Sequence, residues 1–440
     1  MDTPAIPAPK DARERDILER LVAIRDQLLL LKQDRTKYIR TQDVMVLYDQ
    51  TIEQVRQLNE ARSKEPVGEN RLDKVLDSCF QLLSLFFMTI GRTSEAPAAY
   101  SLTSTIKRLL DHLTEADLFS AKDLDSMSKT LDRLSVTVKN AGSKHSPHLI
   151  ELLSDRVDRC KTALSNLRRR LDRLGDTLPS VHEKLISILR SMSLANTRTR
   201  FSVSEVQKLQ NQLKDIDAQR VDGKFMTADG QVAPGSDEVS ELLRRCLLWS
   251  DIVLERKGAI PDNWRPIYDI LVGIRNDLDK LSITQAWSLR ETDLYDFQRQ
   301  LDKIDESRVD GNWLDDEGKP AELYVQRTFL YLIRRSYGYI YSLMISSEPV
   351  SEALLPIYNQ LQTLKRCLVE VKNSGGVGSP RELYPYSMKL NSIDNMRVDG
   401  KFMVGEDIPE GQGSVTELLE ECFELNYELR LAAEAEQGES

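Results

Sequence analysis

The sequence predicts an all-α protein, a tandem array of about five three-helix units of roughly 75–90 residues each. Leu, Glu, Lys and Arg, which are good helix formers, dominate a chain with only 20 glycines and 16 prolines in 440 residues. Apolar residues recur at helical spacing along most of the chain. A six-residue motif also occurs three times at a nearly constant interval, which indicates one structural unit copied in tandem.

That motif is the most specific feature of the chain. It reads Arg-Val-Asp-Gly-Lys-Phe at 220–225 and 397–402, and Arg-Val-Asp-Gly-Asn-Trp at 308–313. The copies are 88 residues (308 − 220) and 89 residues (397 − 308) apart. Asp-Gly is a strong turn signal, because glycine adopts a positive φ without penalty and aspartate bonds its own backbone. Apolar arms around a second turn beyond each copy predict a small hairpin.

Each copy supplies candidate residues for an interaction or for a structural turn. We expect the valines (Val221, Val309 and Val398) and the aromatic residues to close the end of each unit's core. The candidate set comprises Arg220, Asp222, Gly223, Lys224 and Phe225 in the first copy, Arg308, Asp310, Gly311 and Trp313 in the second, and Arg397, Asp399, Gly400, Lys401 and Phe402 in the third.

Helices surround the motif in the same order each time. A second helix precedes it, at 203–216, 294–304 and 383–393, and a third helix follows it, at 237–254, 321–343 and 415–431. A first helix opens each unit, and Pro266 and Pro356 suit its first turn, where a missing N–H costs nothing. The segment from Ser414 to Glu417 reads as a capping box that opens the last helix.

Spacing and apolar pattern alone predict two further, degenerate units upstream. The expected organisation is a disordered tail at 1–15, units at 16–92, 98–176, 178–257, 260–346 and 350–433, and a second disordered tail at 434–440. The linkers between units are short, so we expect neighbouring units to pack end to end, each covering the apolar edge of the next.

Charge and composition narrow the function classes. The net charge of −10 disfavours broad binding to nucleic acid or anionic membranes, although a local basic patch stays open. The longest apolar run, from Cys79 to Ile90, is far short of the ~20 residues of a membrane span. Residues 1–10 lack the basic and apolar regions of a secretory signal. Five scattered cysteines favour reduced thiols in the cytosol or nucleus.

No motif points to catalysis, a cofactor or a metal. Cys79, Cys160, Cys246 and Cys422 recur at a similar place in the third helix, where a small buried hydrophobe is the ordinary role; a redox cysteine would need a setting that lowers its pKa. His145 and His148 lie close together, but zinc prefers four ligands and no other His or Cys is near in sequence. We therefore expect no enzyme activity.

Two interpretations of the motif remain open. In the first it is a tight turn with hydrophobic anchors. In the second, exposed Arg220, Lys224, Arg397 and Lys401 line one side of the array and bind an anionic group or acidic peptide. Asn312 breaks the lysine pattern, and a buried arginine–carboxylate contact with the unit's own helix would equally account for the arginines. Ser202, at a helix start beside Arg198 and Arg200, is a candidate phosphosite.

The triple motif and its helical surroundings resemble a fungal family of helical proteins without assigned function, the UPF0662-type proteins, from about Ile17 to Leu431. The resemblance implies a soluble fungal protein of the cytoplasm, with the nucleus as a second compartment. It implies no catalytic residue or cofactor.

The sequence therefore favours a non-enzymatic scaffold or adaptor that binds another protein or peptide along the array, with no general nucleic-acid binding and no membrane insertion. The alternative is a regulatory binder of a small anionic ligand or phosphopeptide through the Arg-Val-Asp-Gly-Lys turns. An enzyme is the third hypothesis, which a cleft holding titratable residues from two units would revive. The identity of the partner, the oligomeric state and the curvature of the array stay open.

Overall fold

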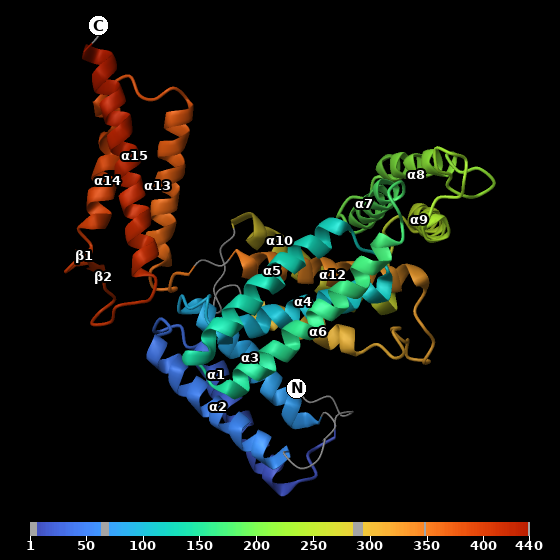
Figure 1. Cartoon of the computed structure of the whole chain (residues 1–440), viewed down its shortest axis with the longest axis horizontal. Coiled ribbons are helices and arrows are strands. Elements are labelled where there is room, and N and C mark those ends of the chain that lie inside the picture. Colours follow the sequence, from blue (N-terminus) through green and yellow to red (C-terminus); the bar gives the residue numbers. More distant parts are fainter. Residues whose placement is uncertain (1–6, 63–69, 285–293, 347–348, 439–440) are drawn as a thin grey trace.

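The computed structural model confirms the all-α class (Figure 1). It describes residues 7–62, 70–284, 294–346 and 349–438, and within these ranges it contains fifteen α-helices and one two-stranded ladder.

The helices of the first half are capped by local signals. Asp11 accepts the amide of Arg13 at 2.8 Å, and Asn70 and Ser120 each form a capping box. These helices are α1 (Ala12–Gln33), α2 (Thr41–Arg62), α3 (Arg71–Thr89), α4 (Ala96–Ala116), α5 (Ala121–Asn140) and α6 (Pro147–Asp172), with a 3-10 turn η1 (Ala141–Ser143) between the last two.

The helices of the second half follow the positions predicted around the motif. The expected second helices are α8 (Val203–Asp217), α11 (Leu294–Glu306) and α14 (Tyr384–Asp394), and the expected third helices are α9 (Ser236–Arg256), α12 (Leu323–Ile345) and α15 (Gln412–Gly438). The remaining elements are α7 (Pro179–Asn196), α10 (Arg265–Thr284), α13 (Leu355–Asn373), β1 (Arg397–Val398), β2 (Lys401–Phe402) and the 3-10 turns η2 (Asp262–Trp264) and η3 (Pro380–Leu383).

One contact recurs along the chain. The first helix of each successive trio packs against the third, in the pairs α1 and α3, α4 and α6, α7 and α9, α10 and α12, and α13 and α15. The cysteines of these third helices meet the same neighbour each time: the thiols of Cys79, Cys160, Cys246 and Cys422 donate to backbone carbonyls of α1, α4, α7 and α13. A copied unit accounts for both regularities, and the division into five such units stays a prediction.

The trios do not pack strictly end to end, and this corrects the expectation from the short linkers. Helix α12 packs along α4, although more than 200 residues separate them, and α11 touches α3. Helix α3 is buried on nearly all sides from Ser78 to Thr89, because α1, α4 and α11 surround it. The first four trios therefore share one continuous apolar core, which contains residues from Ile17 to Met344.

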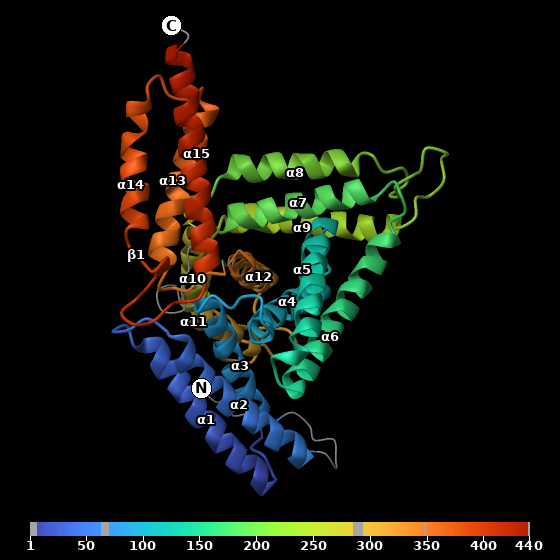
Figure 2. The same cartoon turned by 60° about the vertical axis from the view of Figure 1, so that its left-hand side comes forward.

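Helices α13–α15, which we call the C-terminal module, have a separate core that includes Leu361, Leu390 and Phe402. Figures 1 and 2 show the module standing away from the other helices. Its base meets the loop after α3, where the amide of Glu352 donates to the carbonyl of Thr89 at 2.9 Å and Arg92 pairs with Glu410 at 2.9 Å.

Two glycines allow this base to close tightly. Gly91 has φ 87°, and a Cβ there would lie 2.9 Å from the amide nitrogen of Ser351. Gly411 has φ 97°, and a Cβ there would lie 2.7 Å from the Cα of Val350. Any side chain would clash at either position and would also be strained by the backbone conformation.

Both predicted tails are partly wrong. Residues 7–11 are placed, because the amide of Arg71 donates to the carbonyl of Pro7 at 3.0 Å and Asp11 caps α1; residues 1–6 lie outside the described part. Helix α15 continues to Gly438 through Ala and Glu residues, which favour helix, and only 439–440 lie outside the description. The capping box expected at Ser414 is also wrong, because α15 already begins at Gln412.

Candidate functional site

The three copies of the motif form the predicted hairpin turns. Asp222, Asp310 and Asp399 have φ of 50°, 48° and 50°, and the glycines that follow have φ of 79°, 80° and 75°. Two successive residues with positive φ are what a type I′ hairpin requires, and Asp-Gly is among its preferred sequences. Val221 pairs with Lys224 and Val309 with Asn312, while β1 and β2 pair in the third copy. A second bridge lies beyond each turn, at Met226–Val232, Leu314–Pro320 and Val404–Asp407.

The aromatic residues anchor these turns as predicted. Phe225, Trp313 and Phe402 are all buried. The backbone amide of each aromatic residue donates a hydrogen bond to a side-chain oxygen at the start of the next helix. The acceptors are Ser236 at 2.8 Å, Gln326 at 3.2 Å and Gln412 at 2.9 Å, respectively. These three partners were missed by the sequence analysis, because their type and their distance from the motif both vary. Each turn is thus held by a buried aromatic ring and by one polar side chain of the third helix.

The valines do not help to close the core. The prediction that both the valines and the aromatic residues would do so is therefore wrong for the valines. Val221, Val309 and Val398 are 57%, 53% and 55% exposed. The register gives the reason: Val398 pairs with Lys401, while Arg397 pairs with Phe402. Cross-strand partners share one face of a ladder, and adjacent residues alternate between faces. Burying the aromatic residue therefore turns the valine and lysine to solvent and keeps the arginine on the inner side.

The arginines are bound to carboxylates of the preceding helix. Arg220 pairs with Asp217, and Arg397 pairs with Asp394, with arginine side chains 23% and 26% exposed. Arg308 pairs with Asp305 at 2.7 Å and also with Glu115 of α4, and its side chain is 12% exposed. Arg220 and Arg308 also donate to the carbonyls of Gly223 and Gly311. The arginine thus ties the turn to the end of the second helix.

The motifs do not line one side of the molecule. Figure 1 shows the loop between α8 and α9 at one extremity and β1 and β2 near the opposite one. Lys224 and Lys401 are exposed, but they belong to these distant turns and form no joint site. Asn312 donates to the carbonyl of Asp310 within its own turn at 3.0 Å.

Arg308 belongs to a buried polar network that the sequence analysis also missed. His112 of α4 bonds Asp305 at 2.8 Å, and Arg108 pairs with Asp302 at 3.0 Å. Burial raises the pKa of Asp305, but the hydrogen bond and charge of His112 and the charges of Arg308 and Arg108 outweigh it and hold that pKa below its usual value. The network joins α4 to α11 across about 190 residues of sequence. Helix α12 takes part in it, because the Tyr337 hydroxyl donates a hydrogen bond to Asp302.

The cysteines have the environment of structural thiols. Burial raises the pKa of Cys79 and Cys246 to about 12 and that of Cys160 and Cys422 to about 11, while Cys367 is exposed. A thiol with a raised pKa is a poor nucleophile and metal ligand. The raised pKa values therefore give no support to a redox role for the four buried cysteines.

The paired histidines contact residues of α2. His145 shares a 3.0 Å hydrogen bond with Tyr48 and pairs with Glu95, and burial lowers its pKa. His148 bonds Asn59 at 3.0 Å. Within the described residues, no group of three or more His, Cys, Asp or Glu side chains is arranged to hold a metal ion.

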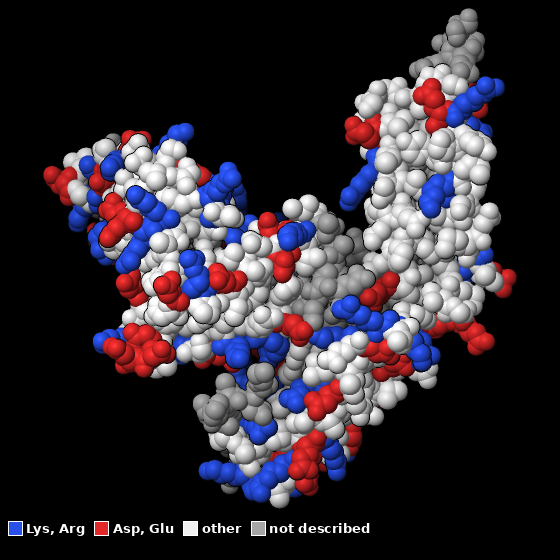
Figure 3. Space-filling model, turned by 180° about the vertical axis from the view of Figure 1, so that it is seen from behind, with Lys and Arg blue, Asp and Glu red and all other residues white. Residues whose placement is uncertain are grey.

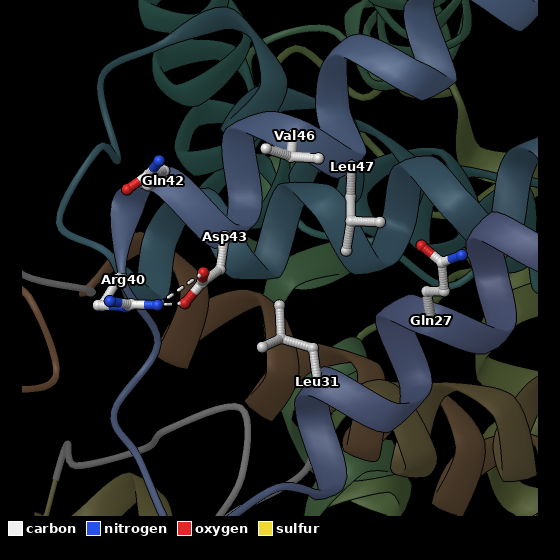
Figure 4. Close-up of a pocket in the computed structure, with 7 residues that line it drawn as sticks. All are labelled: Gln27, Leu31, Arg40, Gln42, Asp43, Val46 and Leu47. Atoms are coloured by element: carbon white, nitrogen blue, oxygen red, sulfur yellow. Dashed lines mark hydrogen bonds and ion pairs between the residues drawn. The ribbon is translucent and has the colours of Figure 1, made fainter.

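A shallow hollow lies between α1 and α2. It has a volume of about 410 Å³ and is lined by Gln27, Leu31, Arg40, Gln42, Asp43, Val46 and Leu47. Figure 4 shows Arg40 and Asp43 bonded to each other, at 3.1 Å, rather than turned as a pair into the hollow. The hollow therefore lacks the converging polar groups of an active site.

Among the described helices, none is long and apolar enough to cross a membrane.

Comparison with known proteins places the chain among fungal relatives. The family described as "Protein of unknown function (DUF2408)" matches residues 171–291 and 348–440. The chain is 36% identical over 437 residues to the CUB1 family protein C30C2.08 of Schizosaccharomyces pombe, covering 97% of this chain and 94% of that relative. The chain belongs to the CUB1 family.

A second fungal relative has the same identity to this chain. The Cu(2+) suppressing and bleomycin sensitive protein 1 of Saccharomyces cerevisiae is 36% identical over 505 residues, covering 97% of this chain and 91% of that relative. No solved structure matches the chain significantly. The expected membership of a fungal family without assigned function is thereby confirmed.

Ser202, the candidate phosphosite, lies where the sequence analysis placed it relative to the fold. It is the N-cap of α8, and its hydroxyl accepts the amide of Glu205 at 3.3 Å. Arg198, four residues before Ser202 in the sequence, is already paired with Glu205 at 2.8 Å. A phosphate here would meet the positive end of the helix dipole and a nearby arginine. Phosphorylation of Ser202 stays a prediction.

Proposed function

We propose that this CUB1 family member is a non-enzymatic helical scaffold that binds another protein through its C-terminal module. The observation that carries the proposal is a set of exposed apolar side chains on α14 and α15, which we call the α14–α15 face. It consists of Tyr384, Met388, Tyr427 and Leu431, which are 65%, 51%, 54% and 45% exposed.

The four residues form two pairs on adjoining turns. Tyr384 and Met388 are four residues apart on α14, and Tyr427 and Leu431 are four apart on α15, so each pair lies along one side of its helix. Ser387 and Asn426, next to Met388 and Tyr427, are joined by a 2.9 Å hydrogen bond. This contact holds the two pairs at the same level of the module.

The chemistry of the face suits a protein partner. Tyrosine and methionine are enriched at protein interfaces, and large exposed apolar patches commonly mark interaction sites. The Arg430 guanidinium lies 5.5 Å from the centre of the Tyr427 ring, which adds a polar border. Over the C-terminal module, the surface seen in Figure 3 combines a broad uncharged area with scattered charged side chains.

The absence of enzyme activity is part of the same proposal. Its support is the shallow hollow beside Arg40 and Asp43 and the burial of the His112–Asp305 pair, which leave no converging acid, base or nucleophile at an accessible cleft in the described chain. Residence in the cytoplasm and nucleus is also proposed, supported by five free thiols, which suit a reducing compartment. Ligand binding by the repeated turns receives less support, because Arg220 and Arg397 already bind carboxylates.

Site-specific crosslinking tests the scaffold proposal. A photoreactive amino acid is placed at Met388 in the full chain expressed in its native cells, and the matched control carries it at Val136, which is 57% exposed on α5. Crosslinked proteins are identified by mass spectrometry. The proposal expects one protein captured reproducibly from position 388 and not from 136. Equal capture from both positions, or none from 388 when labelling is complete, overturns it.

A further inference from the structure

Four arginines gather where α7, α9 and α12 meet, and we call them the arginine cluster: Arg190, Arg245, Arg327 and Arg334. Arg190 is on α7, Arg245 on α9, and the other two on α12. Helix α12 carries three arginines and no acidic residue over its 23 residues. In a chain with a net charge of −10, this concentration of positive charge needs an explanation.

Carboxylates compensate only part of this charge. Arg190 pairs with Asp123 at 2.5 Å, and this is the one salt bridge that the four make within the described residues. Arg245 donates to the carbonyl of Ala116 at 2.7 Å, and Arg334 to that of Leu330 in its own helix at 3.1 Å. The guanidinium of Arg327 lies 5.7 Å from the centre of the Trp249 ring. Three of the four thus contact only neutral groups.

The charges of the cluster act on one another. Burial, followed by the charges of Arg190, Arg245 and Arg327, lowers the pKa of Arg334 to about 10, although Glu115 acts in the opposite direction. Burial, followed by the charge of Arg245, lowers the pKa of Arg327 as well. By contrast, the acid-paired Arg108 has a raised pKa despite its burial. The cluster therefore holds positive charge that an anion would relieve.

The side of α12 that carries Arg327 and Arg334 also provides a hydrogen-bond donor, Tyr331, and open space at Gly338. Tyr331 lies one turn from both Arg327 and Arg334, and its hydroxyl makes no hydrogen bond to any described residue. Gly338 follows one turn after Arg334, and no atom lies within 4 Å of the position that a Cβ would take there. Arg327, Tyr331, Arg334 and Gly338 thus line one side of the helix, with open space at Gly338.

We propose that the arginine cluster binds a phosphate group of a small molecule. Guanidinium groups bind phosphate oxygens bidentately, and a tyrosine hydroxyl supplies an additional donor. A small ligand fits better than a long polyanion, because Arg327 and Arg334 are partly buried and the surrounding protein is acidic overall. No residue of this site belongs to the α14–α15 face or to the repeated turns.

The test measures anion binding to the full-length chain. Thermal unfolding and titration calorimetry are carried out with pyrophosphate, with adenosine diphosphate and with sodium chloride at equal ionic strength. The wild type is compared with Arg334→Met and with Arg335→Met, a control on the same helix whose exposed guanidinium lies 4.4 Å from the centre of the Tyr339 ring. Tighter binding of the diphosphate than of pyrophosphate assigns the site to nucleotides; equal binding assigns it to the free anion.

We expect pyrophosphate to raise the wild-type melting temperature beyond the effect of chloride, and Arg334→Met to lose affinity by about tenfold or more while Arg335→Met does not. Without ligand, Arg334→Met should melt no earlier than wild type, because it removes a poorly compensated charge. Arg327→Met serves as a second variant if Arg334→Met does not fold. Stabilisation by pyrophosphate and adenosine diphosphate no greater than that by chloride, or unchanged affinity in a folded cluster variant, overturns the proposal.

Discussion

Replacing Phe402 with alanine tests whether the aromatic residue anchors its turn. Phe402 is 1% exposed and belongs to the separate core of the C-terminal module, whereas Val398 on the opposite face of the same hairpin is 55% exposed. Removing a buried phenylalanine side chain costs about 3–5 kcal/mol, because contacts are lost and a cavity remains. The hydrogen bonds between the Phe402 backbone and the Gln412 side-chain amide do not depend on the ring and should persist. Val398→Ala, at an exposed position, should change stability by no more than about 0.5 kcal/mol.

Hydrogen exchange measured by mass spectrometry is the suitable assay, because it reports the C-terminal module apart from the rest of the chain. A loss of about 3–5 kcal/mol corresponds to roughly 150- to 5,000-fold faster exchange in the protected amides of α13 and α15. Peptides from α3 and α4 should be unaffected and serve as the internal control. The reasoning is refuted if Val398→Ala accelerates exchange as much as Phe402→Ala, or if Phe402→Ala leaves exchange unchanged.

Three further predictions concern the rest of the molecule. In native protein, a thiol reagent should label Cys367 rapidly and the other four cysteines only on unfolding, and rapid labelling of a second cysteine would contradict their burial. Arg308→Ala should cost about 2–3 kcal/mol, since it leaves a buried Asp305 contact unmade, and Arg220→Ala about 1 kcal/mol or less, as denaturant unfolding would show. Burial lowers the pKa of His182, so the contribution of this side chain to stability is complete above about pH 6.5 and is lost as the pH falls through the folded pKa. His182→Phe should therefore flatten the pH dependence of the unfolding midpoint. An unchanged dependence of the midpoint on pH would count against this.

The local structure around the motif could be predicted from the sequence. Helical periodicity and the Asp-Gly turn depend on neighbouring residues, so α8, α9, α11 and α12 were located to within two residues. The burial of Phe225, Trp313 and Phe402 also followed from the pattern. The exposure of the valines did not, because it depends on the register of the hairpin, and both valine and phenylalanine are common in strands.

Contacts between distant segments could not be predicted. The packing of α11 beside α4 rests on pairs such as His112 with Asp305, which are 193 residues apart and leave no periodic signal. The arginine cluster is invisible for the same reason, since Arg190, Arg245 and Arg334 come together only when three helices meet. The predicted terminal tail after residue 433 failed because Ala and Glu near the end of a chain resemble a solvated segment although they favour helix.

Quantitative affinity purification from native cells tests the central claim most directly. It compares the wild type with a Tyr384→Ser/Met388→Ser/Tyr427→Ser variant and with an Arg220→Ala/Arg397→Ala variant, each retaining the melting temperature of its major transition. We predict that a specific protein partner is lost from the first variant and kept by the second, because the exposed apolar face binds it while the arginines only secure turns. Loss of the partner from the arginine variant alone, or its retention by both, would contradict the account.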